Sequence, residues 1–198
     1  MRYFWNFNDM SNFSYGKQYS NIKYLKDQMN YQEFESCTFI ECDFSDCLFA
    51  GLTLIDCTFV ECNFNGTKIA HTSLRTVYFK SCEMIDLNFS MCDKLIFEVH
   101  FNDCRLDFSK FYGLKLNASS FSECSMIAVD FMSANASKIV FDNCDLYRSE
   151  FENANLSAAN LSTSRNYTID PEKTKIKKAV FSLENLSGLL YKHGLEIY

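Results

Sequence analysis

The fold is decided by residues 34–64, which read FESCTFIECDFSDCLFAGLTLIDCTFVECNF and carry an apolar residue at every fifth position. The same period extends outward from Phe34 to Phe89 and, after two extra residues, from Ile96 to Leu161, and all 26 of these central positions are apolar. Helices repeat every 3.6 residues and strands every two, so neither explains a period of five. A short fixed period is typical of a repeat architecture.

A second apolar column lies two residues before each central position. It holds all ten cysteines of the chain, and small residues fill many of its other places. Each five-residue unit is therefore predicted to point two side chains inward and three outward. The cysteines of this column are Cys37, Cys42, Cys47, Cys57, Cys62, Cys82, Cys92, Cys104, Cys124 and Cys144.

A period of twenty residues is superimposed on the period of five. Cys42 and Cys62 are 20 residues apart, as are Cys104 and Cys124, whereas the step from Cys82 to Cys104 is 22. Four units therefore make one square coil, and the two extra residues near 94–95 are expected to bulge outward. About six coils, stacked at the strand spacing of about 4.8 Å, predict a rod about 30 Å long.

This pattern resembles the pentapeptide-repeat family, whose units contain a small residue, a polar residue, Leu or Phe, and two variable residues. Residues 144–148 (CDLYR) and 154–158 (ANLSA) fit that pattern closely, and the resemblance covers about 130 of the 198 residues. It implies an all-β fold, a right-handed quadrilateral β-helix. The chain also resembles the family's quinolone-resistance branch, although many members of that branch carry projecting loops of several residues and this chain has only a two-residue bulge.

The pattern divides the chain into three parts: an N-terminal cap (1–32), a pentapeptide-repeat solenoid (33–162) and a C-terminal module (163–198). The cap is expected to be partly helical from Ser20 to Met29 and to cover the open end of the first coil. Its aromatic residues offer an alternative role in docking a partner. The C-terminal module is expected to form a strand over 175–181 and a helix capped by Ser182 and ended by Gly194.

The C-terminal end also resembles that of the quinolone-resistance branch, in which it pairs two rods end to end. The resemblance implies a homodimer, and the alternative is a monomer whose helix caps the last coil. The candidate dimer contacts are Leu186, Leu189, Leu190, Tyr191, Leu195 and Ile197.

Charge gives the main functional signal. The formal net charge is −6, but residues 33–161 hold 19 acidic and 9 basic residues, a net of −10. Seven carboxylates are predicted to form a ridge along one edge of the rod, opposed there only by Arg105. The members of this predicted ridge are Glu41, Asp43, Glu61, Glu83, Asp103, Glu123 and Asp145.

Two functions fit the ridge. The resemblance implies a DNA mimic that occupies the DNA-binding saddle of a type II topoisomerase, DNA gyrase or topoisomerase IV, and so affects fluoroquinolone susceptibility. The alternative is a generic structural or interaction scaffold with an unknown partner, in which acidic residues serve solubility. The basic stretch 173–178 either steers toward an acidic surface or solvates a strand.

No pattern for catalysis or ligand binding occurs. The histidines (His71, His100 and His193) form no nucleophile or metal-ligand motif, and the chain lacks a glycine-rich phosphate loop and a Cys-x-x-Cys pair. We expect no enzymatic activity, cofactor, metal, small-molecule substrate or direct nucleic-acid binding. No apolar run reaches 18 residues and no secretory leader is expected, so membrane insertion is not expected either. Inward, reduced thiols favour a cytoplasmic location.

Overall fold

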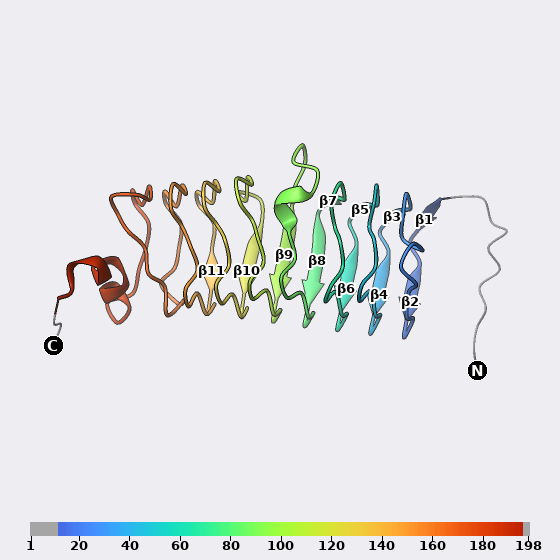
Figure 1. Cartoon of the computed structure of the whole chain (residues 1–198), viewed down its shortest axis with the longest axis horizontal. Coiled ribbons are helices and arrows are strands. Elements are labelled where there is room, and N and C mark those ends of the chain that lie inside the picture. Colours follow the sequence, from blue (N-terminus) through green and yellow to red (C-terminus); the bar gives the residue numbers. More distant parts are fainter. Residues whose placement is uncertain (1–11, 196–198) are drawn as a thin grey trace.

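The computed structural model describes residues 12–195, which form a straight rod of stacked coils (Figure 1). All strand pairs are parallel, and they build a four-stranded sheet of order β1-β3-β5-β7 and a seven-stranded sheet of order β11-β10-β9-β8-β6-β4-β2. The first sheet contains β1 (Phe13–Tyr15), β3 (Glu33–Glu35), β5 (Thr53–Ile55) and β7 (Ser73–Arg75). The second contains β2 (Gln18–Ser20), β4 (Thr38–Ile40), β6 (Thr58–Val60), β8 (Val77–Lys80), β9 (Val99–Asn102), β10 (Ser120–Ser122) and β11 (Phe141–Asp142). The predicted β-helix is confirmed.

The register of the long sheet follows the twenty-residue period. Phe39 pairs with Phe59, Phe59 with Phe79, and Phe101 with Phe121. The 22-residue step is absorbed between β8 and β9, where Phe79 pairs with Phe101. Like side chains therefore stack on like, as the sequence predicted.

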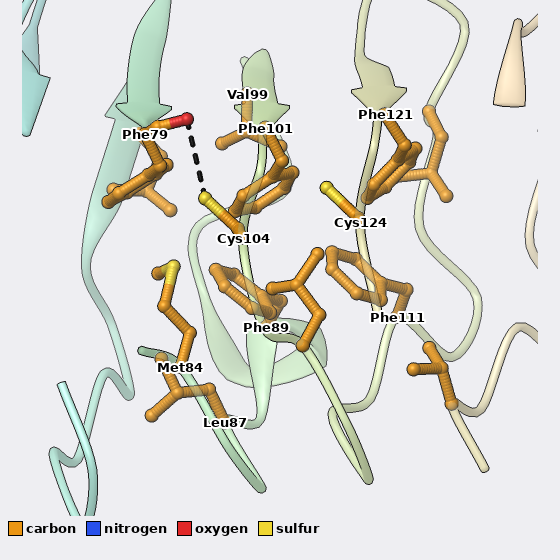
Figure 2. Close-up of a cluster of buried hydrophobic side chains, with 14 of the residues drawn as sticks. Phe79, Met84, Leu87, Phe89, Val99, Phe101, Cys104, Phe111, Phe121 and Cys124 are labelled. Carbon is orange, nitrogen blue, oxygen red and sulfur yellow. Dashed lines mark hydrogen bonds between the residues drawn. The ribbon is translucent and has the colours of Figure 1, made fainter. Parts of the chain in front are cut away.

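Phenylalanine rings fill the interior in a regular arrangement (Figure 2). Rings in successive coils are stacked, with Phe101 and Phe121 at a centroid distance of 5.2 Å and an interplanar angle of 13°. Rings on different walls of the rod meet edge to face, as Phe111 and Phe121 do at 5.5 Å and 89°. Such geometries add about 0.5–1.5 kcal/mol per pair to the gain from burial.

All ten cysteines are free and buried. Their thiols donate to backbone carbonyls. Cys104 Sγ, for example, lies 3.4 Å from Phe79 O (Figure 2). Burial raises the pKa of the Cys57 thiol to about 11 and that of Cys47 also to about 11. At neutral pH these groups therefore remain protonated, and only the thiolate is a good nucleophile.

The native protein is expected to resist thiol reagents. At pH 8 the ten thiols should stay largely unmodified, because all ten are buried and a reagent cannot reach them, whereas denaturant should expose all ten. Mass spectrometry after timed labelling measures both states. Rapid modification of most thiols without denaturant would contradict the packing.

The N-terminal segment differs from its prediction. Residues 20–29 contain no helix; residues 12–31 form a further coil, whose strands β1 and β2 pair with β3 and β4. Tyr19, Tyr24 and Met29 lie 20 residues before Phe39, Phe44 and Phe49 and continue their columns, and Met29 is buried. The first eleven residues of the predicted cap lie outside the described range.

The C-terminal end also continues the coil beyond the predicted boundary. No strand forms over 175–181; isolated bridges join Asn155 to Lys175 and Asn160 to Val180. The predicted helix is replaced by two 3-10 turns, η2 (Leu186–Leu189) and η3 (Tyr191–His193). The Ser182 hydroxyl accepts a hydrogen bond from the Asn185 N–H at 3.3 Å, and η3 ends at Gly194, whose φ is +59°, as predicted.

The two-residue insertion lies after the short 3-10 helix η1 (Phe89–Met91) and projects from the side of the rod (Figure 1). The sequence predicted Ile96 as the inward residue after it, but Ile96 is 48% exposed and Phe97 is 7% exposed. Phe97 and the next inward residue, Val99, are therefore two positions apart, whereas a central residue and the next inward residue are three positions apart elsewhere in the repeat. Residues 93–96 are all exposed, so the projection is longer than the insertion itself.

Candidate interaction surface

Four of the seven predicted ridge carboxylates form a column at one corner of the rod. These residues, which we call the acidic corner, are Glu41, Glu61, Asp103 and Glu123. All four side chains are exposed, and all four backbones are left-handed, with φ values from 50° to 57°. This conformation turns the chain from one wall to the next and directs the side chain outward. Glu41 and Glu61, and likewise Asp103 and Glu123, are one coil or about 4.8 Å apart along the rod, whereas Ser81 occupies the corner between Glu61 and Asp103 and separates them by about 9.6 Å.

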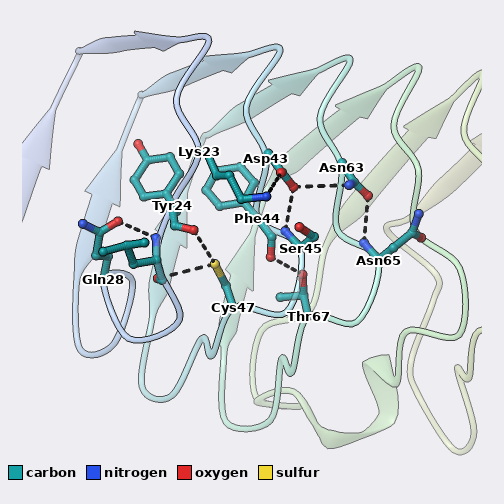
Figure 3. Close-up of polar contacts among 11 residues, drawn as sticks. Lys23, Tyr24, Gln28, Asp43, Phe44, Ser45, Cys47, Asn63, Asn65 and Thr67 are labelled. Carbon is teal, nitrogen blue, oxygen red and sulfur yellow. Dashed lines mark hydrogen bonds and ion pairs between the residues drawn. The ribbon is translucent and has the colours of Figure 1, made fainter. Parts of the chain in front are cut away.

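The other three predicted ridge residues lie on the adjacent wall and are paired with cations. Lys23 Nζ lies 2.9 Å from Asp43 Oδ2 (Figure 3), and Arg165 Nε lies 3.4 Å from Asp145 Oδ2. The hydrogen bond from Lys23 lowers the pKa of Asp43 to about 2. The expectation that Arg105 alone opposes the ridge is therefore wrong.

Glu83, the remaining ridge residue, has a weaker partner. Arg105 Nη1 lies 4.0 Å from Glu83 Oε2, whereas Arg105 Nε lies 2.9 Å from Asp107 Oδ2. Asp107, which the sequence analysis did not single out, is buried and also accepts hydrogen bonds from Ser125 Oγ (2.7 Å) and the Ile127 N–H (3.0 Å). Burial opposes its ionisation, but the hydrogen bonds from Ser125 and Arg105 lower its pKa overall.

A polar ladder connects the first coils on this wall. Asn63 Nδ2 donates to Asp43 Oδ1 at 3.2 Å, and Asn63 Oδ1 in turn accepts from the Asn65 N–H at 3.0 Å (Figure 3). Asp43 Oδ1 accepts from the Ser45 N–H in the same way. These contacts hold the wall beside the acidic corner in a fixed geometry. At the corner itself, Asp103 Oδ2 accepts a hydrogen bond from Ser81 Oγ at 2.8 Å, but no carboxylate of the corner has a cation partner within residues 12–195.

The predicted dimer residues divide into exposed and buried groups. Leu186, Tyr191 and Leu195 are 39%, 54% and 58% exposed, and Leu190 is half-buried. Leu189 is only 9% exposed because it packs on its own chain, which argues against it as a dimer contact. Ile197 lies outside the described residues. Leu183, which was not predicted, is 89% exposed at the same end.

One hydrogen-bonded group on the outer face of β9 and β10 resembles a catalytic arrangement. His100 Nδ1 lies 2.9 Å from Ser120 Oγ, and His100 Nε2 lies 3.3 Å from Glu98 Oε1. The imidazole also stacks on Tyr78 at 4.7 Å. The group lies on a wall whose inner side is filled by phenylalanines. We interpret it as a surface network that ties three coils together.

Within residues 12–195, no group of three or more His, Cys, Asp and Glu side chains is placed to hold a metal ion. None of the helices in that range is both long and apolar enough to cross a membrane.

Comparisons with known proteins give one family match and several structural ones. The family model described as a pentapeptide repeat region matches residues 32–95 and 94–170. A search of curated proteins finds no match. Trypsin-treated QnrB1, described as a plasmid-mediated fluoroquinolone resistance protein, is 16% identical, with a TM-score of 0.55 over 94% of this chain and 100% of that one. HetL, a pentapeptide repeat protein from the cyanobacterium Nostoc sp. Strain PCC 7120, is 10% identical, with a TM-score of 0.56 over 86% of this chain and 85% of that one. These identities support a shared fold alone.

Proposed function

Because the chain belongs to the pentapeptide-repeat proteins, we propose that it is a non-enzymatic, cytoplasmic interaction protein whose acidic corner enters a basic groove that normally receives duplex DNA. The observation that carries this proposal is the straight column of four exposed carboxylates, none of which forms an ion pair within the described chain. Duplex DNA carries one negative charge per about 1.7 Å of axis, so the column is a sparser but similarly straight array. Its charge would accelerate and orient association more than it would tighten binding.

The partner that we propose is a type II topoisomerase, DNA gyrase or topoisomerase IV. The fold shared with QnrB1, whose description is a fluoroquinolone resistance protein, supports this choice. The exposed projection at 93–96 adds a second contact point, since Leu95 is 84% exposed. A homodimer through the C-terminal end stays a prediction, and the exposed Leu183, Leu186 and Leu195 support it.

Reversal of the acidic corner should abolish this activity. In a supercoiling assay, the wild-type protein at micromolar concentration is expected to inhibit DNA gyrase or to protect it from a fluoroquinolone. The variant with Glu41→Lys, Glu61→Lys, Asp103→Lys and Glu123→Lys should be at least about tenfold weaker, because each new lysine repels the basic groove.

The matched control makes the same change in charge elsewhere. It carries Asp56→Lys, Asp86→Lys, Glu150→Lys and Glu184→Lys, four exposed carboxylates that form no ion pair within residues 12–195. Circular dichroism checks that both variants fold. The proposal fails if the wild-type protein has no effect on either enzyme, or if the control loses as much activity as the acidic-corner variant.

A second candidate function is a general interaction scaffold with another partner. Two observations favour it. Three of the seven predicted ridge carboxylates are paired with cations. HetL, described as involved in heterocyst differentiation regulation, matches the fold as well as QnrB1 does. This candidate would be favoured if the wild-type protein neither inhibited nor protected DNA gyrase and topoisomerase IV.

A further inference from the structure

One wall in the C-terminal half of the rod is basic. Its outward positions come from four pentapeptides in successive coils (114–118, 134–138, 154–158 and 174–178), and these twelve positions hold five lysines and no Asp or Glu. The remaining positions are Asn, Ser or Ala. We call this wall the lysine face, and its lysines are Lys115, Lys138, Lys175, Lys177 and Lys178.

The backbone holds the lysine face straight and rigid. Bridges join Lys115 to Asn135, Asn135 to Asn155, and Asn155 to Lys175, so three coil steps of about 4.8 Å separate the two lysines by about 14 Å. A neighbouring column is fixed by the hydrogen bond from the Ala158 N–H to Lys177 O at 2.9 Å. The backbone positions that carry the five lysines are therefore regularly spaced.

These charges are not neutralised by the protein. All five lysines are exposed, and none forms an ion pair within residues 12–195. The adjacent Lys173 differs, because its Nζ lies 3.2 Å from Glu152 Oε1 at the edge of the face. Between the lysines, Asn155 Nδ2 donates to Asn135 Oδ1 at 3.2 Å, an amide ladder that adds further polar groups to the surface.

The composition of the face selects among anionic partners. It offers no aromatic side chain on which the bases of a single strand would stack. It also offers no large exposed apolar side chain to enter a lipid bilayer. Lysine and asparagine donors in a straight array suit the regular phosphates of a duplex, which supply the sequence-independent part of DNA binding.

We propose that the lysine face binds the phosphate backbone of duplex DNA without sequence preference. This departs from the expectation of no direct nucleic-acid binding. The face depends on residues 174–178, which continue the coils beyond the boundary that the sequence predicted. The column that contains Ser125 lies beside the acidic corner. Ser125 belongs to unit 124–128, which comes two sides of the square after unit 114–118 of the lysine face in the same coil. The lysine face therefore lies on the wall opposite the Ser125 column and one wall away from the acidic corner, because Glu123 ends the intervening unit, 119–123. The two surfaces do not overlap and can act independently.

Anisotropy of a short labelled duplex tests the proposal. The wild-type protein should bind at about 50 mM salt and lose affinity steeply toward about 200 mM, since each neutralised phosphate contributes about 0.9 to the logarithmic salt slope. Changing Lys138→Glu, Lys175→Glu and Lys178→Glu together should weaken binding at least about tenfold and reduce the slope by about 2–3.

The control variant, Lys68→Glu, Lys80→Glu and Lys110→Glu, reverses three exposed lysines on other walls of the rod and should bind nearly as the wild type does. The acidic-corner variant should also retain duplex binding, so this proposal and the topoisomerase proposal fail separately. Three results would overturn the assignment: no duplex binding at low salt, equal losses in both lysine variants, or tighter binding to a single strand or to anionic lipid vesicles than to the duplex.

Discussion

Phe111→Ala is expected to lower the free energy of unfolding by about 3–5 kcal/mol, the usual cost of removing a buried phenylalanine ring. Phe111 is fully buried, and its ring stacks on Phe89 at 4.7 Å and on Phe131 at 5.3 Å. It also meets Phe101 and Phe121 edge to face. The coils above and below hold these neighbours in place, so they cannot move in to fill the cavity.

The control lies three residues earlier in the same coil. Phe108 is 52% exposed and has a φ of +63°, so Phe108→Ala removes an equal volume from the outside of a corner. Its effect should stay within about 0.5 kcal/mol. Urea unfolding followed by circular dichroism measures both values. Equal losses of stability in the two variants would show that the inward and outward positions have been misassigned.

Most of the fold was predictable because the repeat reduces a three-dimensional problem to two periods. Once four pentapeptides form one coil, every residue contacts its counterpart about twenty positions away. Cys62 and Cys124 had to share a wall and Phe59 had to be buried, as the structure shows. No long-range contact had to be inferred beyond this stacking rule.

The ends were harder to predict because the repeat is less pure there. The first coil has Ser14 where later coils have Phe34 and Leu54, and its Tyr19 and Tyr24 remain half-exposed. An end coil is packed on one side only, so it tolerates polar residues at central positions. The twenty-residue spacing from Met29 to Phe49 was nevertheless visible in the sequence.

This error at the ends became an error in the electrostatics. Lys23 and Arg165, which pair with Asp43 and Asp145, both lie outside the solenoid boundaries that the sequence suggested. Each cation is 20 residues from its carboxylate, one coil away. If the predicted solenoid omits a coil at one end, the prediction also omits the cation in that coil, and the carboxylate one coil further in is wrongly expected to be unpaired. Asp43 and Asp145 were counted as unopposed members of the ridge for this reason, whereas the acidic corner was unaffected.

The second large loss of stability is expected at the insertion. There the five-residue period places Ile96 in the core, whereas the structure places Phe97 in the core. Phe97→Ala should lower the free energy of unfolding by about 3 kcal/mol, since Phe97 is 7% exposed and its ring meets Phe89 edge to face at 6.4 Å. Ile96→Ala should cost about 0.5 kcal/mol or less, because Ile96 is 48% exposed.

The same urea titration separates the two assignments. If Ile96→Ala were the more destabilising change, the central positions would run through the insertion as the sequence suggested, and the projection would be limited to residues 94–95. The expected order instead means that the chain leaves the core after Cys92 and returns at Phe97. The exposed Leu95 and Ile96 are then held away from the rod. Their removal should therefore alter contacts with a partner without disturbing the stacked coils.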